Sequence, residues 1–201
     1  FNKSKNRISY SISTSQKDFE SIYQDVLSVS KSLDSIDNKY LNFKSIVLKD
    51  ENHYVVPSVT IPKSIKNIYS KYSDIDKIEY DSIISKLETS PIKYLTDKYD
   101  LIKDFYGIEK KISVNDFMAI EKYIETNEKY SLYNDLAKIS GKFYSETILP
   151  SYYKARYLEE SGKPEKAMLL YRSAYNMKEV QGLTKEYLLK LADQIQSDFN
   201  L

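Results

Sequence analysis

The chain has 201 residues, which is enough for one or two domains with a sizeable core. Thirty basic and 29 acidic residues leave a net charge of +1, so no electrostatic signature of a protein that binds nucleic acid or an anionic membrane is visible. Because cysteine is absent, a disulfide framework, a thiolate nucleophile and a cysteine zinc site are excluded. No apolar stretch approaches the roughly 20 residues of a membrane-spanning helix.

The composition indicates an ordered and mostly helical protein, with 41% hydrophobic residues and 20 tyrosines that supply much of the apolar area. Lysine, asparagine, serine, isoleucine and tyrosine are favoured, as in proteins from AT-rich bacterial genomes. The compartment stays open between cytoplasm, periplasm and exterior, because a chain that begins with Phe would hide a signal peptide that had been removed.

The first predicted elements are a strand, a helix and a second strand. Residues 7–13 alternate isoleucine or tyrosine with serine, the pattern of a half-buried strand. Thr14 and Ser15 are expected to cap the helix, and residues 41–48 form the second strand. A crossover of this length favours parallel strands. Two strands alone leave unpaired edges, so this part must pack on the tail or on another copy, which would give a homodimer. The apolar helix positions, spaced three and four apart, are Phe19, Ile22, Val26, Val29 and Leu33.

The only histidine, His53, follows the second strand and the polar run 49–52. A helix is predicted after Pro57 and Pro62. A lone imidazole on the loop after the last strand of a sheet is where an α/β-hydrolase keeps its general base. A single histidine is usually a surface residue or a satisfied core residue, so this interpretation stands beside the catalytic one. The apolar positions of the predicted helix are Ile61, Ile65, Ile68, Tyr69 and Tyr72.

The motif D-E-N-H-Y-x-V-P, followed by I-P-K-S-I-K-N-I-Y, resembles the C-terminal end of the esterase family of α/β-hydrolases that includes esterase D-like and enterochelin-esterase-like proteins. In that family the last strand is followed by a Glu-x-His or Asp-His element, a proline step and a closing helix, and bacterial members carry a helical tail. The resemblance covers most of the chain. It implies that His53 is the general base of a serine triad, that Glu51 matches the family's loop, and that the intact protein acts on an ester.

The resemblance also indicates where the triad acid lies, just past the strand that matches residues 8–12. Asp18 is the nearest carboxylate and Glu20 is the second choice. A triad needs a buried carboxylate within hydrogen-bond reach of the imidazole Nδ1. The alternative is that Asp18 lies in the first turn of the helix and interacts with the helix dipole. Asp50 and Glu51 are equally compatible with solvated loop residues.

A hydrolase of this family also needs a serine in a G-x-S-x-G turn and backbone donors for the oxyanion. No serine here is flanked in that way, and average usage would give roughly three times as many glycines as the chain contains. In the family the nucleophile precedes the acid and the base. We therefore expect the chain to be the C-terminal portion of a longer esterase-like protein and to be inactive by itself. The four glycines stand at 107, 141, 162 and 182.

The remaining residues are predicted to be helical throughout. Residues 73–112 form a connector whose second helix ends at Gly107, a C-cap signal. Ser113 opens the next helix, Asn127 ends it, and the following helix ends at Ser140–Gly141. The closing helix spans residues 185–199.

The clearest pattern in this tail resembles a tetratricopeptide repeat, with an earlier and more degenerate copy at Leu132, Leu136 and Ile139. Such a tail can bind a peptide or protein on its concave side, or it can brace the hydrolase domain. The positions that match small, large, turn, small, aromatic and small residues are Ala155, Leu158, Gly162, Ala167, Tyr171 and Ala174.

The sequence therefore predicts a mostly helical α+β protein with three parts: residues 1–72 from the end of an α/β-hydrolase sheet, a connector over 73–112, and a tetratricopeptide-like tail over 113–201. The predicted function is that of the C-terminal portion of a serine esterase, with His53 as general base and Asp18 orienting it. The alternative is a non-catalytic interaction module. We expect no cofactor and no metal, because acidic residues are scattered and histidine occurs once.

Overall fold

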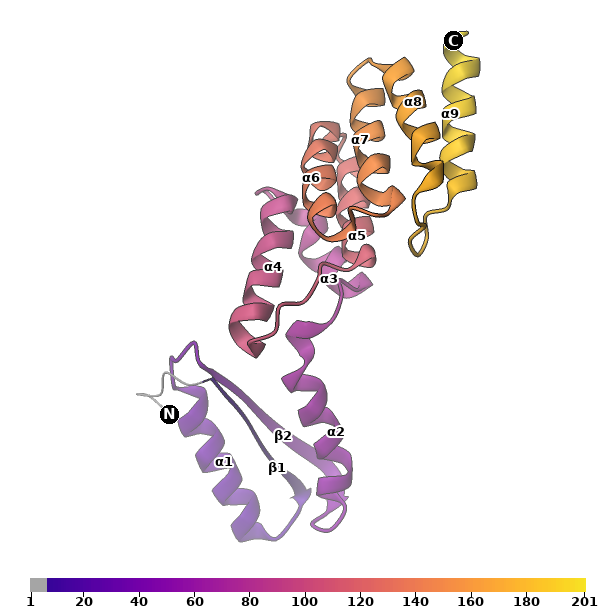
Figure 1. The fold of residues 1–201 in the computed structure, drawn as a ribbon. Coiled ribbons are helices and arrows are strands. Elements are labelled where there is room, and N and C mark those ends of the chain that lie inside the picture. The colour runs from indigo at the N-terminus through magenta and orange to yellow at the C-terminus, as the bar shows by residue number, and fades with distance from the viewer. Residues whose placement is uncertain (1–6) are drawn as a thin grey trace. The chain divides into compact units, whose positions relative to one another are not determined.

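The computed structural model describes residues 7–201 and divides the chain into two compact units, one ending at Ser73 and the other comprising Asp74–Leu201. The first six residues of the predicted 1–72 domain lie outside the described residues. Nine α-helices and one two-stranded sheet make up the described part, so the predicted mostly helical α+β class is confirmed (Figure 1). Residues 74–112, part of the predicted connector, cluster with the tail.

The first unit is a parallel two-stranded sheet with a helix on each face (Figure 1). Ser30 Oγ of the first helix lies 2.8 Å from Ser45 Oγ, and Ser13 Oγ lies 3.0 Å from Thr60 Oγ1 of the second helix. Ser13 pairs with Ile46, the neighbour of Ser45, so the two helices cover opposite faces. The elements are β1 (Ile8–Lys17), α1 (Glu20–Asp34), β2 (Leu41–Asn52), α2 (Val56–Ile68) and a 3₁₀ turn, η1 (Ser70–Tyr72).

Both strands are longer than the sequence pattern predicts. The proposed cap residues Thr14 and Ser15 lie inside β1, where they pair with Val47 and Leu48, and β2 continues through the polar run to Asn52. Helix α1 consequently begins at Glu20, and Asp18 precedes it instead of lying in its first turn. Ladder hydrogen bonds between the strands prevail here over the local capping preference of Thr and Ser.

Helix α2 also differs from its prediction. It begins before Pro57, which stands in the first turn, where a missing amide hydrogen is tolerated, and it continues through Pro62. The face that packs on the sheet contains Val56 and Val59, next to Ile46 and Leu48 of β2. Ile61 and Ile65, two positions of the predicted apolar stripe, are instead 56% and 52% exposed and lie at the surface of this unit.

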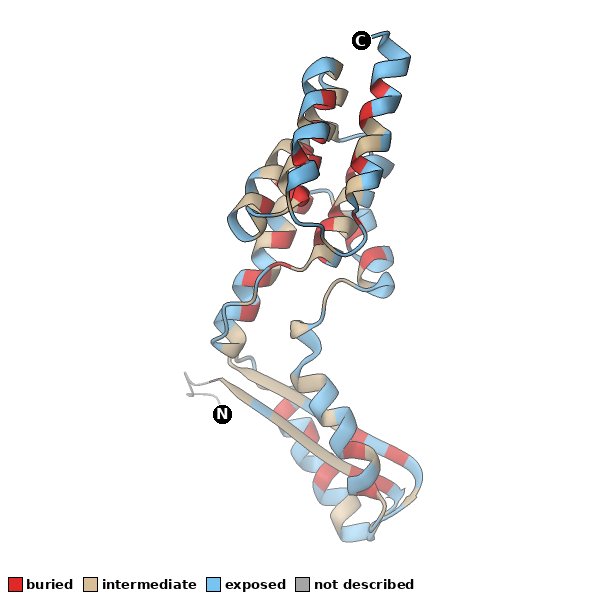
Figure 2. Ribbon diagram, turned by 45° about the vertical axis from the view of Figure 1, so that its right-hand side comes forward, coloured by how far each residue is buried: buried red, intermediate tan, exposed pale blue. Residues whose placement is uncertain are grey.

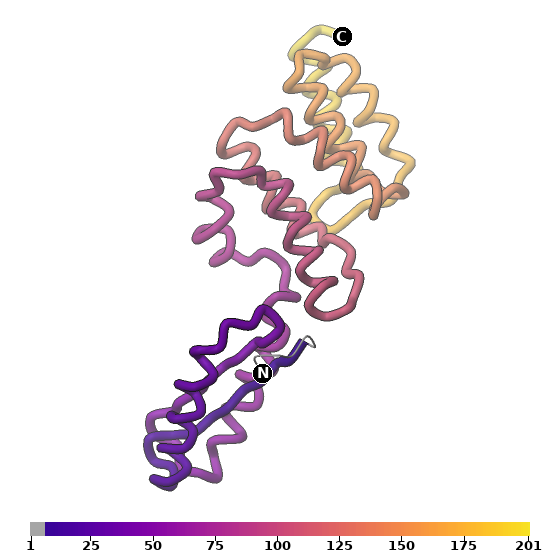
Figure 3. Tube along the Cα trace, turned by 90° about the vertical axis from the view of Figure 1, so that its left-hand side faces the viewer, coloured from indigo at the N-terminus to yellow at the C-terminus, as the bar shows by residue number. Residues whose placement is uncertain are grey.

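The second unit consists of consecutive helices, and α6 to α9 pack side by side in chain order (Figure 3). Side chains of Ser90, Ser113, Thr147 and Thr184 cap four of these helices. The elements are α3 (Lys77–Ser82), α4 (Pro91–Tyr106), α5 (Val114–Thr126), α6 (Tyr133–Tyr144), α7 (Ile148–Glu160), α8 (Pro164–Ser173) and α9 (Lys185–Phe199), with 3₁₀ turns η2 (Ile84–Lys86), η3 (Tyr130–Leu132) and η4 (Ala174–Asn176).

The predicted helix boundaries in this unit are mostly confirmed. Helix α4 ends at Gly107, whose φ of 67° is left-handed, and α5 opens at Ser113 and ends before Asn127. One boundary is wrong, because α6 continues through Gly141 to Tyr144. Gly141 keeps a negative φ, and a methyl group there would lie 4.0 Å from Pro150 Cβ, an ordinary contact, so this glycine does not end the helix.

Helices α7 and α8 form a hairpin around Gly162, which has a φ of 70°. Ala155 and Ala167 are fully buried on either side of this turn, as are Tyr171 and Ala174. Small side chains allow the two helices to approach closely, and the tyrosine fills the space beside them. The predicted turn at Gly162 and the predicted packing of Ala155 and Ala167 are therefore confirmed, Leu158 is only half-buried, and the assignment to the tetratricopeptide family stays a prediction.

The core of the second unit is rich in tyrosine, and Figure 2 shows buried positions on most of its helices. Phe117 packs edge-on against Tyr144 and beside Tyr153. The buried Asp116 accepts hydrogen bonds from the Ile75 amide at 2.6 Å and from the Tyr99 hydroxyl at 2.9 Å, which ties the segment before α3 to α4 and α5. The largest fully buried side chains are Tyr123, Tyr133, Tyr153, Tyr171 and Phe117.

Candidate functional site

Asp18 and His53 each follow the carboxyl end of a strand in the first unit. The strands β1 and β2 are parallel, and their last pair joins Lys17 to Asn52. The residues just beyond that pair are therefore brought to the same edge of the sheet, which is where α/β proteins place ligands and catalytic groups. Asp18 and His53 are 35 positions apart in the sequence, and the parallel register makes them neighbours.

The Nδ1 atom of His53 lies 2.7 Å from Oδ1 of Asp18. An ionised carboxylate can only accept, so Nδ1 carries the proton of this hydrogen bond and the tautomer is fixed by its partner. The Asp18 side chain is 2% exposed, whereas the His53 side chain is 40% exposed. The pair thus joins a covered carboxylate to an accessible imidazole whose Nε2 makes no hydrogen bond within residues 7–201.

Two further donors hold Asp18. The hydroxyl of Thr14, a fully buried residue, donates to Oδ2 at 2.9 Å, and the amide of Phe19 donates to Oδ1 at 2.8 Å. Burial by itself raises the pKa of Asp18, but the hydrogen bonds from Thr14, His53 and Phe19 outweigh it and leave the pKa of this carboxyl below its ordinary value. Asp18 is therefore ionised at neutral pH and suited to orienting an imidazole.

Aromatic side chains flank the imidazole. The ring of Phe19 lies 5.0 Å from the His53 ring between centroids, and the ring of Tyr54 lies at 5.4 Å and edge-on. Phe19 is 55% and Tyr54 is 82% exposed within this unit. The surface next to the imidazole therefore combines one basic nitrogen with two apolar rings.

The structure brings together Asp18 and His53 but not the other sequence candidates. Glu20 lies in the first turn of α1 and accepts a hydrogen bond from Gln24. Asp50 pairs with Lys17 at 3.1 Å on the surface, where its side chain is 79% exposed. The sequence did not predict that Thr14 binds Asp18. Thr14 comes just before a run with helical periodicity, so the sequence predicts a helix cap, whereas in the structure Thr14 is a residue of β1 whose hydroxyl donates to Asp18.

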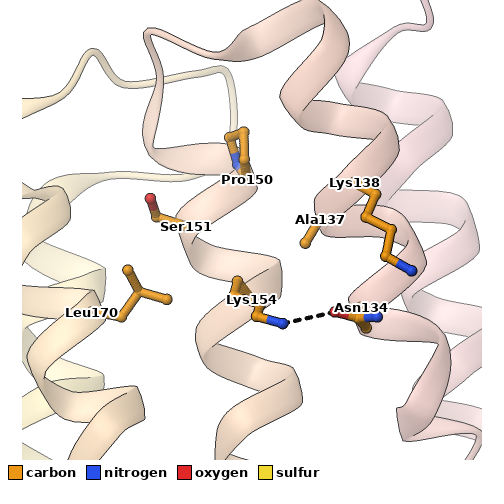
Figure 4. A pocket seen from close by; sticks show the side chains of 7 residues that line it. All are labelled: Asn134, Ala137, Lys138, Pro150, Ser151, Lys154 and Leu170. Carbon is orange, nitrogen blue, oxygen red and sulfur yellow. Dashed lines mark hydrogen bonds between the residues drawn. The ribbon is translucent and has the colours of Figure 1, made fainter.

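A second concave surface lies on the helical unit, between α6, α7 and α8 (Figure 4). This groove has a volume of about 380 Å³. Lys154 Nζ donates to Asn134 Oδ1 at 2.8 Å across it, and Lys138 lies at its edge. Its residues are Asn134, Ala137, Lys138, Pro150, Ser151, Lys154 and Leu170.

In the part of the chain that the structure describes, no three His, Asp or Glu side chains are grouped so that they could hold a metal ion. Across the same residues, no helix combines the length and the apolar character needed to cross a membrane.

Comparisons with known proteins identify one similar fold and no similar protein of known activity. No protein-family model matches the chain, and no curated protein matches it. The chain is similar to a crystal structure of an uncharacterised protein from Capnocytophaga ochracea DSM 7271, with a TM-score of 0.76 and 22% sequence identity. The match covers 96% of this chain and 54% of that chain, so the chain spans about half the length of the solved structure that it matches.

Proposed function

We propose that this chain is the C-terminal portion of a serine esterase-like hydrolase in which His53 is the general base and Asp18 orients it. The observation that carries the proposal is the 2.7 Å hydrogen bond between His53 Nδ1 and Asp18 Oδ1 at the carboxyl ends of two parallel strands. A base held by a carboxylate through Nδ1 presents Nε2 to a nucleophile, which is the arrangement of the acid and the base in a serine triad.

In the proposed reaction, Nε2 of His53 takes the proton of a serine hydroxyl while the serine oxygen attacks the carbonyl carbon of an ester. Asp18 stays ionised and stabilises the imidazolium that forms. The imidazolium then protonates the departing alkoxide, and the same base activates water to release the acid from the serine. The serine and the oxyanion donors have no counterpart in the 201 residues, because no G-x-S-x-G turn occurs among them.

The first test uses the chain by itself with small activated esters such as 4-nitrophenyl acetate. We expect no turnover above the uncatalysed rate, because an imidazole without a nucleophile and an oxyanion site adds little. Turnover far above that of free imidazole at the same concentration, and lost in His53→Ala, would contradict this and would assign a nucleophile to another residue of the chain.

The decisive test uses the intact protein encoded by the full reading frame, which we expect to contain a G-x-S-x-G turn upstream of Phe1. Asp18→Asn should lower kcat about 10⁴-fold, because asparagine favours the wrong imidazole tautomer. His53→Gln should lower kcat by a similar factor. Glu20→Gln is the matched control and should leave kcat unchanged, since Glu20 accepts a hydrogen bond from Gln24 and takes no part in the Asp18–His53 pair. Equal losses in Glu20→Gln and Asp18→Asn would refute the assignment, as would a reading frame without the turn.

The groove between α6, α7 and α8 supports a second candidate, a non-catalytic module that binds an acidic peptide segment. Lys138 and Lys154 supply positive charge beside the apolar surface of Ala137, Pro150 and Leu170. Lys154→Glu should abolish binding of acidic peptides in a fluorescence anisotropy assay, while Lys190→Glu, at an exposed position of α9 that does not line the groove, should not. Loss of self-association in the Lys154→Glu variant would instead identify a second copy of the chain as the occupant.

A further inference from the structure

A separate cavity of about 240 Å³ lies in the helical unit, enclosed by α5, α7, α9 and the loop before α9. Its walls combine one carboxylate with three phenol rings and three aliphatic or thioether side chains. Gly182 in the loop has a φ of 81°, and a side chain there would meet the terminal methyl of Met118. The lining residues are Met118, Glu121, Leu149, Tyr152, Tyr153, Gly182, Leu183 and Tyr187.

Glu121 provides the only carboxylate of this lining. The Tyr152 hydroxyl donates to its Oε1 at 2.5 Å, and the Tyr153 hydroxyl donates to its Oε2 at 3.3 Å. A carboxylate has about four acceptor positions, so these two bonds leave part of its capacity unused. Burial raises the pKa of Glu121, and the nearby Glu125 raises it further. The surrounding groups therefore do not fully offset the cost of burying the negative charge of Glu121.

The positive charge of Arg156 lowers the pKa of Glu121 only through space and without an ion pair to it. Arg156 lies on α7 and forms ion pairs with Glu125 at 3.4 Å, Glu159 at 3.3 Å and Glu160 at 3.7 Å. No ion pair reaches Glu121 from any residue between 7 and 201. A buried carboxylate is costly unless a positive charge neutralises it, so the cavity is electrostatically suited to a cation from outside.

The aromatic walls indicate which kind of cation fits. The Tyr152 ring lies 5.3 Å from the Tyr153 ring and 6.4 Å from the Tyr187 ring, between centroids. Tyr152 and Tyr153 are buried, whereas Tyr187 is 44% exposed and stands at the rim. Phenol faces attract cations through the ring quadrupole, and several rings around one site form the aromatic cages that hold quaternary ammonium groups.

We propose that this cavity binds a compact quaternary ammonium group, with Glu121 as the counter-charge and the rings of Tyr152 and Tyr187 as the aromatic walls, while the fully buried Tyr153 holds the carboxylate through its hydroxyl. A primary ammonium must pair three hydrogen-bond donors when it leaves water, and two tyrosines already occupy part of the acceptor capacity of Glu121. A quaternary ammonium has no donor to satisfy and is weakly hydrated, so it loses less on leaving water. The cavity and its ligand are independent of the proposed hydrolase site.

The test is isothermal titration calorimetry of the full chain with choline and with its neutral isostere 3,3-dimethylbutan-1-ol. The two molecules share shape and hydroxyl group and differ in charge. We expect saturable binding of choline and at least about tenfold weaker binding of the alcohol. Equal affinities would overturn the proposal, because shape alone would then explain them, and so would the absence of saturable choline binding.

Variants of Tyr187 at the rim of the cavity and of Glu121 in its wall test whether choline binds there. Tyr187→Leu should weaken choline binding about 2- to 30-fold, the range of one cation–π contact, while Tyr187→Phe should retain it within about 2-fold. Tyr175→Leu is the matched control, because Tyr175 is 46% exposed and outside the cavity lining. Glu121→Gln keeps acceptor atoms for both tyrosines and should weaken binding more than about tenfold. Parent-like affinity in Tyr187→Leu would show that choline binds elsewhere and would refute the assignment.

Discussion

Each unit contains a carboxyl group that is largely covered by protein, and the pKa of this group shifts in opposite directions in the two units. In the first unit, Asp18 receives hydrogen bonds from Thr14, Phe19 and His53, and its pKa is lowered. In the second unit, burial raises the pKa of Glu121, although two tyrosine hydroxyls donate to it. The comparison shows that the balance between desolvation and charge-stabilising donors decides the outcome. Hydrogen bonds from an imidazole, a hydroxyl and an amide lower the pKa of Asp18, whereas burial and the neighbouring Glu125 raise the pKa of Glu121 and make its charged form more costly.

The hydrophobic cores of the two units also differ, in the kind of side chain that they bury. In the first unit, Ile46 and Leu48 of β2 form a small aliphatic cluster with Val56 of α2. The second unit buries whole aromatic rings, including those of Phe117 and Tyr153. We therefore expect core substitutions to have their largest effects in the second unit.

Phe117→Ala should give the largest effect, a loss of about 3–5 kcal/mol in the free energy of unfolding of the helical unit. The side chain is fully buried between the rings of Tyr144 and Tyr153, and its removal leaves a cavity. Hydrogen exchange measured residue by residue would show this loss for amides of α5 to α7. If amides of β1 and β2 lost protection equally, the two units would unfold together, and the expectation that the substitution affects mainly the helical unit would be wrong.

Ala167→Leu should cost about 1–3 kcal/mol in chemical denaturation, because Ala167 is fully buried at the hairpin of α7 and α8 and a larger side chain overpacks that contact. Lys166→Leu, one residue away on the exposed side, is the matched control and should be nearly neutral. Equal midpoints for Ala167→Leu and the parent would show that the helices can separate to admit the larger side chain.

Acid should change the stability effects of Asp18→Asn and Glu121→Gln in opposite directions. A carboxyl whose pKa is lowered by folding stabilises above its unfolded pKa and loses that contribution as the pH falls through its folded pKa. The deficit of Asp18→Asn relative to the parent should thus shrink from about pH 4 downward. A carboxyl whose pKa is raised by folding destabilises the fold at neutral pH, so any advantage of Glu121→Gln should disappear on acidification. Denaturant midpoints measured from neutral to acidic pH would check both trends.

Thr14→Val should raise the pKa of Asp18, because it removes one of the hydrogen bonds that stabilise the ionised form. Thr14→Ser keeps the hydroxyl and should leave the pKa of Asp18 close to that of the parent. Carbon-detected NMR titration of the Asp18 carboxyl reports the value directly. An unchanged pKa in Thr14→Val would mean that the Phe19 amide and His53 alone hold the carboxylate.

Part of this arrangement could be predicted from sequence alone. The alternation in residues 8–12, the run 43–48 and the crossover length predicted two parallel strands, and parallel strands bring the residues after their carboxyl ends to one edge. This topology, together with the resemblance to the esterase family, predicted Asp18 beside His53. The helix ends at Gly107 and Ser113 were also predictable, because capping is a local property of a few residues.

Other features depended on contacts between distant residues. The strands run on to Lys17 and Asn52 because each supplies the other's hydrogen bonds, which no local window contains. Helix α2 buries Val56 and Val59 instead of Ile61 because the sheet, not the helix, determines the covered face. The cavity around Glu121 combines side chains from α5, α7 and α9, and nothing in the separate segments indicates that they meet.

The tyrosine-rich core has an optical consequence. The chain contains 20 tyrosines and no tryptophan, so its near-ultraviolet absorbance and fluorescence come from phenol rings. Burial raises the pKa of Tyr133, Tyr152 and Tyr171, all in the helical unit. These phenols therefore ionise mainly after the unit opens, and each contributes stability that is present below about pH 10 and is lost in stronger alkali. The absorbance of phenolate would follow alkaline opening of the helical unit without any added label.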